Sequence, residues 1–325
     1  MSGARGATRH GDSAIHHTEE APVAKTDATI KRSRPASRPE KPAGEPGKAA
    51  GSGAPFDGVL GEFVAFTVSA LGLTDPGTRL RALASTGTSL LRVNRGVIVK
   101  GHRKSPAKPL QLFEAEYCPF CRHVRESLTE LDLDAMIYPV PKGGKRFRNR
   151  LIKLGGKATV PFLHDPNTGT KLYESEAIAT YLYKEYGLDW EKVPERRITT
   201  STLASASRGK SGMFAKPSKA PQKPLELYSF EGSPYARLVR ETLCELEIPY
   251  LLHNCGKTPG SHADYLPPEY RAEYVHDYMP GTDNRRKFLQ RAGKIQMPYL
   301  IDPNTGVAMF ETRAIQDYLR KTYGA

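Results

Sequence analysis

Short apolar runs alternate with amphipathic stretches between residues 110 and 187. The runs have the length of strands, whereas Val124, Leu128 and Leu131 recur on one face of a helix. The predicted strands are residues 110–113, 135–140, 160–163 and 171–173, and the predicted helices are residues 119–131, 145–154 and 174–186. Gly187 follows the last helix in a usual terminating position. This order of elements predicts a compact α/β sandwich with a core of its own.

The same pattern returns in residues 225–324, so the chain contains an internal repeat. The tetrapeptide CPFC at 118–121 aligns with SPYA at 233–236, and the turn DPNTG at 165–169 recurs letter for letter at 302–306. Self-similarity of this extent indicates two copies of one module. The offset between the copies grows from about 115 to about 137 residues, which gives the second copy an insertion.

The insertion lies at roughly residues 255–280 and is rich in tyrosine. Tyr270, Tyr274 and Tyr278 recur at every fourth position, which predicts one face of a helix. We expect this face to pack against its own domain, and the alternative is that it walls a pocket above Ser233.

The two cysteines of the CPFC segment, Cys118 and Cys121, share one turn at the start of a predicted helix. Unpaired N–H groups there stabilise a thiolate, and the thiolate is the form that attacks disulfides. A second thiol one turn later can resolve a mixed disulfide. The alternative is a structural thiol pair or half of a zinc site, although Cys244 and Cys255 do not form a second CxxC. We interpret Cys244 as a structural thiol.

Together these features resemble the thioredoxin fold, in its glutaredoxin and glutathione-transferase N-terminal branch. The resemblance implies that Cys118 and Cys121 form a dithiol active site and that Val160-Pro161 is a cis-proline segment beside it. It also implies that Glu174 and Ser175 hold the γ-glutamyl end of glutathione, while the simpler reading is that they only cap the last helix. Glutathione is then the cosubstrate, and no metal is predicted.

The second copy has no thiol in its SPYA segment. Ser233, Met297, Pro298, Glu311 and Thr312 nevertheless match the positions that bind glutathione in the family, which predicts a second glutathione site without disulfide exchange. The alternative is a degenerate copy that is kept for packing. The helical domain that follows this module in transferases has no counterpart after either copy, which disfavours conjugation of bulky electrophiles.

We therefore predict two tandem thioredoxin-fold domains of the glutaredoxin and transferase type, preceded by a tail and a short helical segment. The predicted parts are a disordered tail at 1–54, a helical segment and basic linker at 55–108, module 1 at 109–188, a basic linker at 189–223 and module 2 at 224–325. Glutaredoxins often place a lysine three residues before the first cysteine, where this chain has Ala115. Arg122 and Arg125 are candidates to replace that charge, and the alternative is that Arg125 and its match Arg240 are surface helix residues.

The chain carries 48 basic and 35 acidic residues, a net charge of +13. Residues 141–157 hold seven Lys or Arg and no acid, including Lys142, Lys145, Arg146 and Arg148. We interpret this segment as attracting anionic glutathione rather than nucleic acid, for which no motif is present. Association of residues 59–73 with a membrane surface is a minority reading. Four cysteines and no secretory signal favour the cytoplasm, without excluding an organelle.

The predicted function is glutathione-dependent reduction of glutathionylated proteins or small disulfides at Cys118 and Cys121. One rival is a glutathione-binding or scaffold protein without turnover, or a transferase-like protein that lacks the helical domain. Another is an iron–sulfur dimer ligated by glutathione and Cys118.

Overall fold

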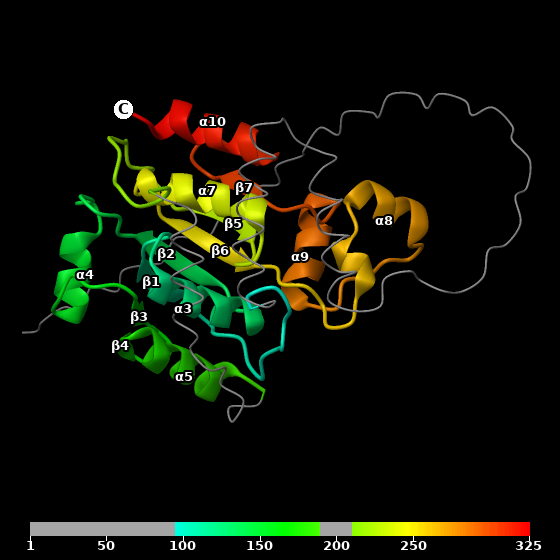
Figure 1. The fold of residues 1–325 in the computed structure, drawn as a ribbon, viewed down its shortest axis with the longest axis horizontal. Helices are drawn as coiled ribbons and strands as arrows, with labels where there is room; N and C mark the ends of the chain where they lie inside the picture. The colour runs from blue at the N-terminus through cyan, green and yellow to red at the C-terminus, as the bar shows by residue number, and fades with distance from the viewer. Residues whose placement is uncertain (1–94, 189–209) are drawn as a thin grey trace, which may run out of the picture. The chain divides into compact units, whose positions relative to one another are not determined.

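The computed structural model describes residues 95–188 and 210–325, and we call residues 109–188 module 1 and residues 224–325 module 2 (Figure 1). The predictions for residues 1–54 and 59–93, and for most of the linker at 189–223, lie outside the described residues. The elements of module 1 are β1 (Leu110–Glu114), α3 (Pro119–Glu130), β2 (Ala135–Pro139), α4 (Arg148–Gly155), β3 (Phe162–His164), β4 (Lys171–Tyr173) and α5 (Ser175–Tyr186). Those of module 2 are β5 (Leu225–Ser229), α7 (Pro234–Glu245), β6 (Tyr250–Asn254), η2 (His262–Tyr265), α8 (Pro268–Tyr274), α9 (Asp283–Ala292), β7 (Tyr299–Asp302), β8 (Val307–Phe310) and α10 (Thr312–Tyr323). The predicted elements of module 1 are therefore confirmed, with shifts only at their ends.

The two modules share one eight-stranded sheet in the order β4-β3-β1-β2-β6-β5-β7-β8. Within each module the first two strands are parallel, and β2 and β6 then pair in antiparallel fashion across the centre. Met136 pairs with Leu251, its equivalent in the repeat, so a pseudo-twofold axis passes through this pair. Since β1 and β5 consequently run in opposite directions, the segments that follow them lie at opposite ends of the sheet.

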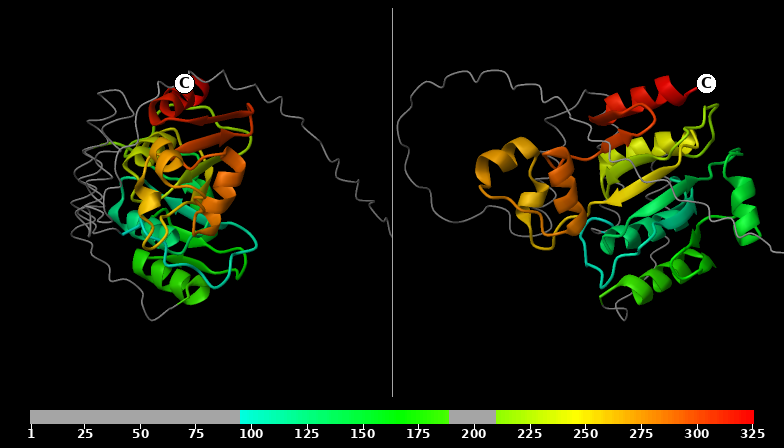
Figure 2. Two further views of the ribbon diagram at one scale, coloured as in Figure 1. Left: turned by 90° about the vertical axis from the view of Figure 1, so that its right-hand side faces the viewer. Right: turned by 180° about the vertical axis from the view of Figure 1, so that it is seen from behind.

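The main apolar core is common to both modules. Leu112 and Leu227 of the central strands belong to one cluster, together with residues of α3, α5, α7 and α10. The neighbouring strand residues Phe113 and Tyr228 point to the other face, where α4 and α9 cover two smaller clusters. The prediction of a separate core for each copy is therefore wrong for the helical face that carries α3 and α7. Figure 2 shows α5 and α10 toward opposite edges of the sheet.

Each module also caps a segment of the other. Asp132, at the end of α3, accepts a hydrogen bond from the backbone N–H of Asn284 in α9 at 3.3 Å. Its equivalent Glu247, at the end of α7, accepts one from the N–H of Arg146 just before α4 at 3.0 Å. Both acidic residues adopt positive φ, 53° and 48°. These reciprocal contacts fix the modules to one another beyond the shared strand pair.

The repeated DPNTG turns tie each hairpin to the last helix of its module. Asp165 accepts hydrogen bonds from the hydroxyls of Tyr181 and Tyr186, at 2.6 and 2.5 Å. Asp302 does the same with Tyr318 and Tyr323 at 2.6 and 2.5 Å. The identity of these turns in the two copies is thus explained by folding and not by chemistry at a site.

The insertion of module 2 forms η2 and α8, and its tyrosines are not arranged as predicted. Tyr270 and Tyr274 are 55% and 67% exposed and stack on each other, so their face does not pack on the domain. Tyr278 lies after α8 and donates a hydrogen bond to Asp264. The helix is too short, at seven residues, to carry three tyrosines on one face. Among the described helices, none has the length and apolarity that crossing a bilayer requires.

Candidate functional site

The CPFC segment forms the beginning of α3, as the sequence predicts. Cys118 is the N-cap residue, and its Sγ accepts a hydrogen bond from the backbone N–H of Cys121 at 3.4 Å. Pro119 occupies the first helical position, where no donor is needed. Cys118 keeps 7% of its surface exposed, whereas Cys121 is fully buried. The first cysteine is therefore the one that a reactant meets.

The two thiols ionise differently. A hydrogen bond from the Cys121 side chain lowers the pKa of Cys118 to about 7, with further help from the N–H groups of Cys121 and Phe120 and from the charge of Arg125, although burial acts in the opposite direction. Burial raises the pKa of Cys121 well above its ordinary value, and its interaction with Cys118 adds to this. A pKa of about 7 leaves about half of Cys118 as thiolate at neutral pH, while Cys121 stays a thiol that can donate to it.

The residues expected to bind glutathione in module 1 lie in the cis-proline segment and at the start of α5. The Val160–Pro161 peptide bond is cis, and Val160 packs against the cluster that contains Cys118 and Cys121. Glu174 has φ of 65°, a conformation that side chains rarely adopt, immediately before α5, and α5 packs along α3. Ser175 begins α5, and its buried Oγ has no hydrogen-bond partner among the described residues. The start of α5 therefore offers a polar ligand a carboxylate on a strained backbone position, Glu174, and an unsatisfied hydroxyl, Ser175.

A third thiol, Cys244, lies beside the pair, and no pattern in the sequence indicates this proximity. Cys244 of α7 belongs to the same buried cluster as Cys118 and Cys121, and its Sγ accepts a hydrogen bond from the N–H of Glu116 at 3.5 Å. The equivalent residue Thr129 accepts from the N–H of Glu231 at 3.1 Å. Since α3 and α7 run in opposite directions, the end of each helix meets the start of the other. Burial raises the pKa of the Cys244 thiol well above its ordinary value, in agreement with a structural role.

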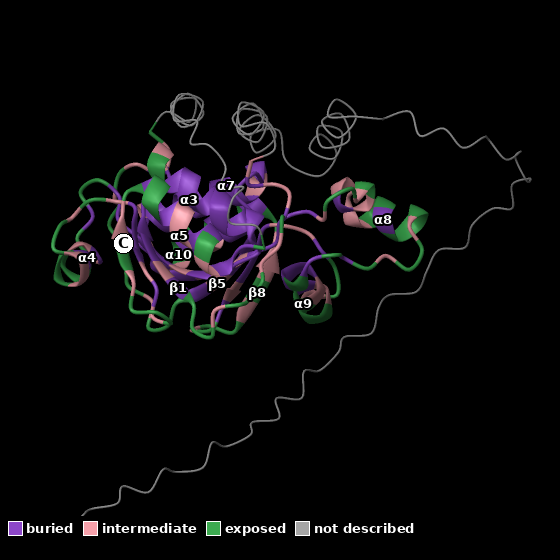
Figure 3. Ribbon diagram, turned by 90° about the horizontal axis from the view of Figure 1, so that it is seen from below, coloured by how far each residue is buried: buried purple, intermediate pink, exposed green. Residues whose placement is uncertain are grey.

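Helices α3 and α7 are largely buried (Figure 3), and a network of ion pairs links them and the segments that precede them. Arg125 donates to Glu231 at 2.8 Å and also to Glu114, and Arg240 donates to Glu116 and to Glu231 at distances of 2.9–3.1 Å. All five side chains are at most 3% exposed. The interpretation of Arg125 and Arg240 as surface residues is therefore wrong, while the charge of Arg125 does favour the Cys118 thiolate. The signal that could have found this network is the recurrence of Arg125 and Glu116 at one offset, as Arg240 and Glu231.

The network perturbs its own carboxyl groups. Burial raises the pKa of Glu114 to about 7, even though Arg125 acts in the opposite direction. For Glu231, burial is outweighed by Arg125 and Arg240, which hold the pKa of this carboxyl far below its usual range. Glu231 is thus the anion that both modules share.

The basic segment before α4 is divided between two roles. Arg146 donates to the carbonyls of Leu246 and Glu247 in module 2 at 2.9 and 2.6 Å, so it holds the modules together. The ammonium of Lys142 lies 5.5 Å from the ring centroid of Tyr117, the residue before Cys118. Of these two cations, only Lys142 remains suited to attracting an anionic ligand to the thiol.

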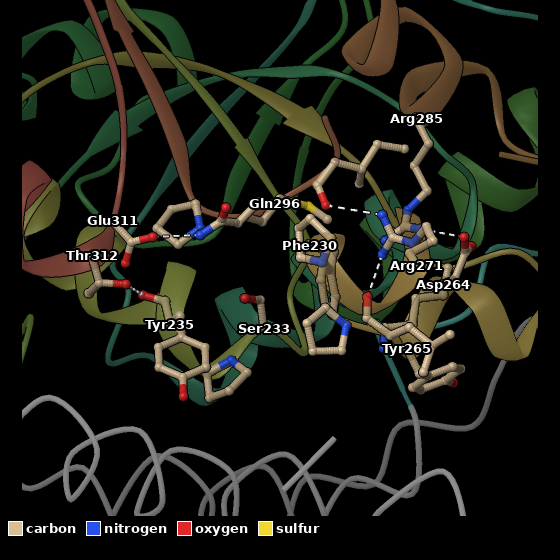
Figure 4. A pocket seen from close by; sticks show the side chains of 18 residues that line it. Phe230, Ser233, Tyr235, Asp264, Tyr265, Arg271, Arg285, Gln296, Glu311 and Thr312 are labelled. Carbon is tan, nitrogen blue, oxygen red and sulfur yellow. Dashed lines mark hydrogen bonds and ion pairs between the residues drawn. The ribbon is translucent and has the colours of Figure 1, made fainter. Parts of the chain in front are cut away.

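Module 2 contains a pocket of about 120 Å³ at its SPYA segment (Figure 4). The five residues predicted as a second glutathione site all line it, namely Ser233, Met297, Pro298, Glu311 and Thr312. Ser233 is the N-cap of α7, and its Oγ accepts from the N–H of Ala236 at 3.2 Å. The Met297–Pro298 bond is cis, and Glu311 has φ of 73° and accepts from the Gln296 amide at 2.5 Å. The arrangement around the thiol site of module 1 is thus repeated with a hydroxyl in place of the thiolate.

The other wall of this pocket comes from the insertion. Tyr265 of η2, Pro267 before α8 and Arg271 of α8 line it, together with Arg285 of α9. The alternative expectation, that the insertion walls a pocket above Ser233, is therefore correct for the segment, although Tyr270 and Tyr274 take no part in it.

A family model described as glutathione S-transferase, N-terminal domain, matches residues 112–192 and again residues 227–325. No curated protein sequence matches the chain. Among similar solved structures is a glutathione transferase of Bombyx mori, with 30% identity over 29% of this chain and 43% of that chain and a TM-score of 0.24. A delta-class glutathione transferase of Nilaparvata lugens has 32% identity, covers 27% and 40% of the two chains and has a TM-score of 0.23. A trimeric glutathione transferase of Leishmania has 12% identity, covers 67% and 68% and has a TM-score of 0.22. The chain spans less than half the length of the first two structures.

Proposed function

We propose that this chain, which belongs to the family of glutathione S-transferase N-terminal domains and carries two copies of that domain, is a glutathione-dependent thiol–disulfide oxidoreductase. Cys118 is the proposed nucleophile and Cys121 the resolving thiol. The observation that carries the proposal is the placement of two thiols at one helix start, where the Sγ of Cys118 caps α3 and accepts from the N–H of Cys121 at 3.4 Å while Cys121 is fully buried. The pKa of Cys118 is lowered to about 7 at a helix start, and that of Cys121 is raised.

The proposed substrate is a mixed disulfide between glutathione and a protein thiol. The Cys118 thiolate attacks the glutathione sulfur, a Cys118–glutathione disulfide forms, and the protein thiolate leaves and takes a proton from water. A second glutathione thiolate then attacks the glutathione sulfur of this intermediate, which restores the Cys118 thiolate and releases oxidised glutathione. Alternatively, Cys121 loses its proton and attacks Cys118, which releases glutathione and leaves a Cys118–Cys121 disulfide for two further glutathione molecules to reduce.

In the proposed complex, the tripeptide is held by the cis-proline segment and by the start of α5. The backbone at Val160–Pro161 pairs with the cysteinyl part of glutathione in this proposal. Glu174 binds the γ-glutamyl ammonium, and the start of α5 with the Ser175 hydroxyl receives the neighbouring carboxylate. The unsatisfied Oγ of Ser175 supports this placement, because a buried hydroxyl ordinarily has a partner.

Reduction of a glutathionylated test protein by the full chain, with glutathione and glutathione reductase, measures the proposed activity. We expect Cys118→Ser to lower the rate at least 100-fold, because no other thiol of the site is ionised at neutral pH. Cys121→Ser is the matched variant and should retain the route through a second glutathione. Equal rates for Cys118→Ser and the unaltered chain would remove Cys118 from the mechanism.

A second function, binding of glutathione without turnover, is proposed for module 2. The observation that favours it is the pocket that unites Ser233, Pro298, Glu311 and Thr312 where no thiol is present. Calorimetry with S-methylglutathione, which cannot exchange disulfides, should give two sites per chain. Glu311→Gln should abolish one site and Glu174→Gln the other. If instead the unaltered chain binds one ligand and Glu311→Gln does not change this number, binding is restricted to module 1.

A further inference from the structure

The pocket of module 2 extends beyond the positions that match a glutathione site. In Figure 4, Glu311 and Thr312 lie at one end, Ser233 and Phe230 in the middle, and Arg271 with Arg285 at the other end. Module 1 has no counterpart to η2 and α8, which supply the far wall. The far end is therefore a feature of this chain's insertion.

Arg271 is a buried cation that lacks a carboxylate partner. Its guanidinium donates to three backbone carbonyls, those of Ala263 at 2.9 Å, Leu266 at 2.7 Å and Ile295 at 3.3 Å. The side chain is 7% exposed and forms no ion pair among the described residues. A guanidinium has five N–H donors, so these contacts leave two. The guanidinium carbon also lies 4.7 Å from the centroid of the Tyr278 ring, but no carboxylate is bonded to it among the described residues.

The neighbouring cation, Arg285, does have a carboxylate partner. Arg285 pairs with Asp264 at 2.7 Å, so that carboxylate is already engaged. Lys257 also lines the pocket, with its ammonium 3.2 Å from the centroid of the Tyr265 ring. The far end consequently carries more positive than negative charge. A buried charge is stable when it is paired, and the missing group here is an anion.

The remaining wall of the far end is apolar and flat. Phe230 and Tyr265 supply rings, Pro267 and Pro268 supply rigid proline faces, and Ile295 closes the side. Such walls fit a flat apolar body, while a few placed polar groups fix its orientation.

We propose that this end of the pocket binds a compact aromatic carboxylate next to the glutathione position of module 2. The ring lies among Phe230, Tyr265 and the two prolines, and the carboxylate accepts hydrogen bonds from the free donors of Arg271. The claim that both ligands bind together rests on the proposed function of module 2, whereas binding of the acid alone does not.

Fluorescence titration of the full chain with 1-naphthoate, and with neutral 1-naphthamide as its matched isostere, tests the inference. We expect the acid to bind at least tenfold more tightly than the amide. Arg271→Gln should remove this preference, while Arg286→Gln, at a partly exposed arginine of α9 that does not line the pocket, should leave it unchanged. Circular dichroism compares the folding of the two variants, and the ratio of acid to amide in the unaltered chain needs no variant.

Equal affinity for the acid and the amide, absence of binding, or an equal loss in Arg286→Gln would overturn the inference. Saturation with S-methylglutathione separates it from the proposed function. Naphthoate that binds while S-methylglutathione does not leaves this inference standing and removes the second glutathione site. If S-methylglutathione binds to module 2 and naphthoate does not, the second glutathione site stands and this inference falls. Competition between the two ligands would refute joint occupancy.

Discussion

Removal of the Cys121 thiol tests why Cys118 is reactive. The largest influence that lowers the pKa of Cys118 is the hydrogen bond from the Cys121 side chain. A hydrogen bond to a charged group is worth about 1.5–3 kcal/mol, which corresponds to roughly one to two pKa units. Cys121→Ala should therefore raise the pKa of Cys118 from about 7 to roughly 8–9. Cys121→Ser retains a donor and should leave the pKa near the original value.

Alkylation by iodoacetamide between pH 5 and pH 10, with the modified peptide identified by mass spectrometry, reports the ionisation of Cys118. At pH 7 the ionised fraction should fall from about one half to roughly 1–10% in Cys121→Ala, which slows alkylation about 5- to 50-fold. At pH 10 the two proteins should react alike. Cys118→Ser supplies the baseline, because burial raises the pKa of the remaining thiols, Cys244 and Cys255 among them.

A midpoint that stays near pH 7 in Cys121→Ala would show that the helix start and Arg125 suffice, and that the thiol–thiol hydrogen bond contributes little. A midpoint near pH 9 in the unaltered chain would refute the whole account of Cys118 as a thiolate, and with it the proposed first step.

Three further outcomes follow from the structure. Arg240→Ala should lower the free energy of unfolding by about 3–5 kcal/mol in urea denaturation, because it removes a buried cation that pairs with both Glu116 and Glu231. The half-exposed Arg320→Ala should change it by less than about 0.5 kcal/mol. Burial opposes the charge of His253, but its hydrogen bonds with Asp134 and Glu226 raise its pKa to about 9. Its stabilisation relative to His253→Gln, ~3 kcal/mol at most, should be complete below pH 6.5 and vanish as the pH rises through about 9. Ser175→Ala should weaken S-methylglutathione binding to module 1 about tenfold while leaving thermal stability unchanged, since the hydroxyl has no partner to lose; a lower melting temperature with unaltered affinity would contradict this.

The sequence predicted the local elements and the positions of the chemistry because both depend on neighbouring residues. The helix start at Cys118 follows from Pro119 and the apolar spacing after it, and the hairpins follow from a repeated turn. The cis bonds lie before Pro161 and Pro298, the two prolines that the resemblance indicated. These features are set within a few residues of each other, where a pattern in the chain is informative.

The contacts between the modules could not be predicted in the same way. Arg125 looks like an exposed helical residue, because Glu231, the partner that buries it, lies 106 residues away. The strand at Ala135–Pro139 has two similar edges, and nothing local indicates that one of them pairs with β6. The exposure of Tyr270 has the same origin, since helical spacing defines a face but does not say what covers it.

The pseudo-twofold arrangement explains why two such similar copies support different chemistry. The positions where one copy has a thiol and the other does not lie at one end of the sheet, because the end of α7 meets the start of α3. Cys118 and Cys121 replace Ser233 and Ala236, and across the interface Cys244 stands where the other end has Thr129. Thiols therefore collect at the module 1 end, and the insertion with its pocket enlarges the module 2 end. Since Glu231 lies at the start of α7 and pairs with Arg125, whose charge favours the Cys118 thiolate, a ligand that moved the start of α7 would reach the thiol through this shared carboxylate. The fused sheet thus joins the end with the proposed redox site and the end with the proposed binding site by a defined set of ion pairs.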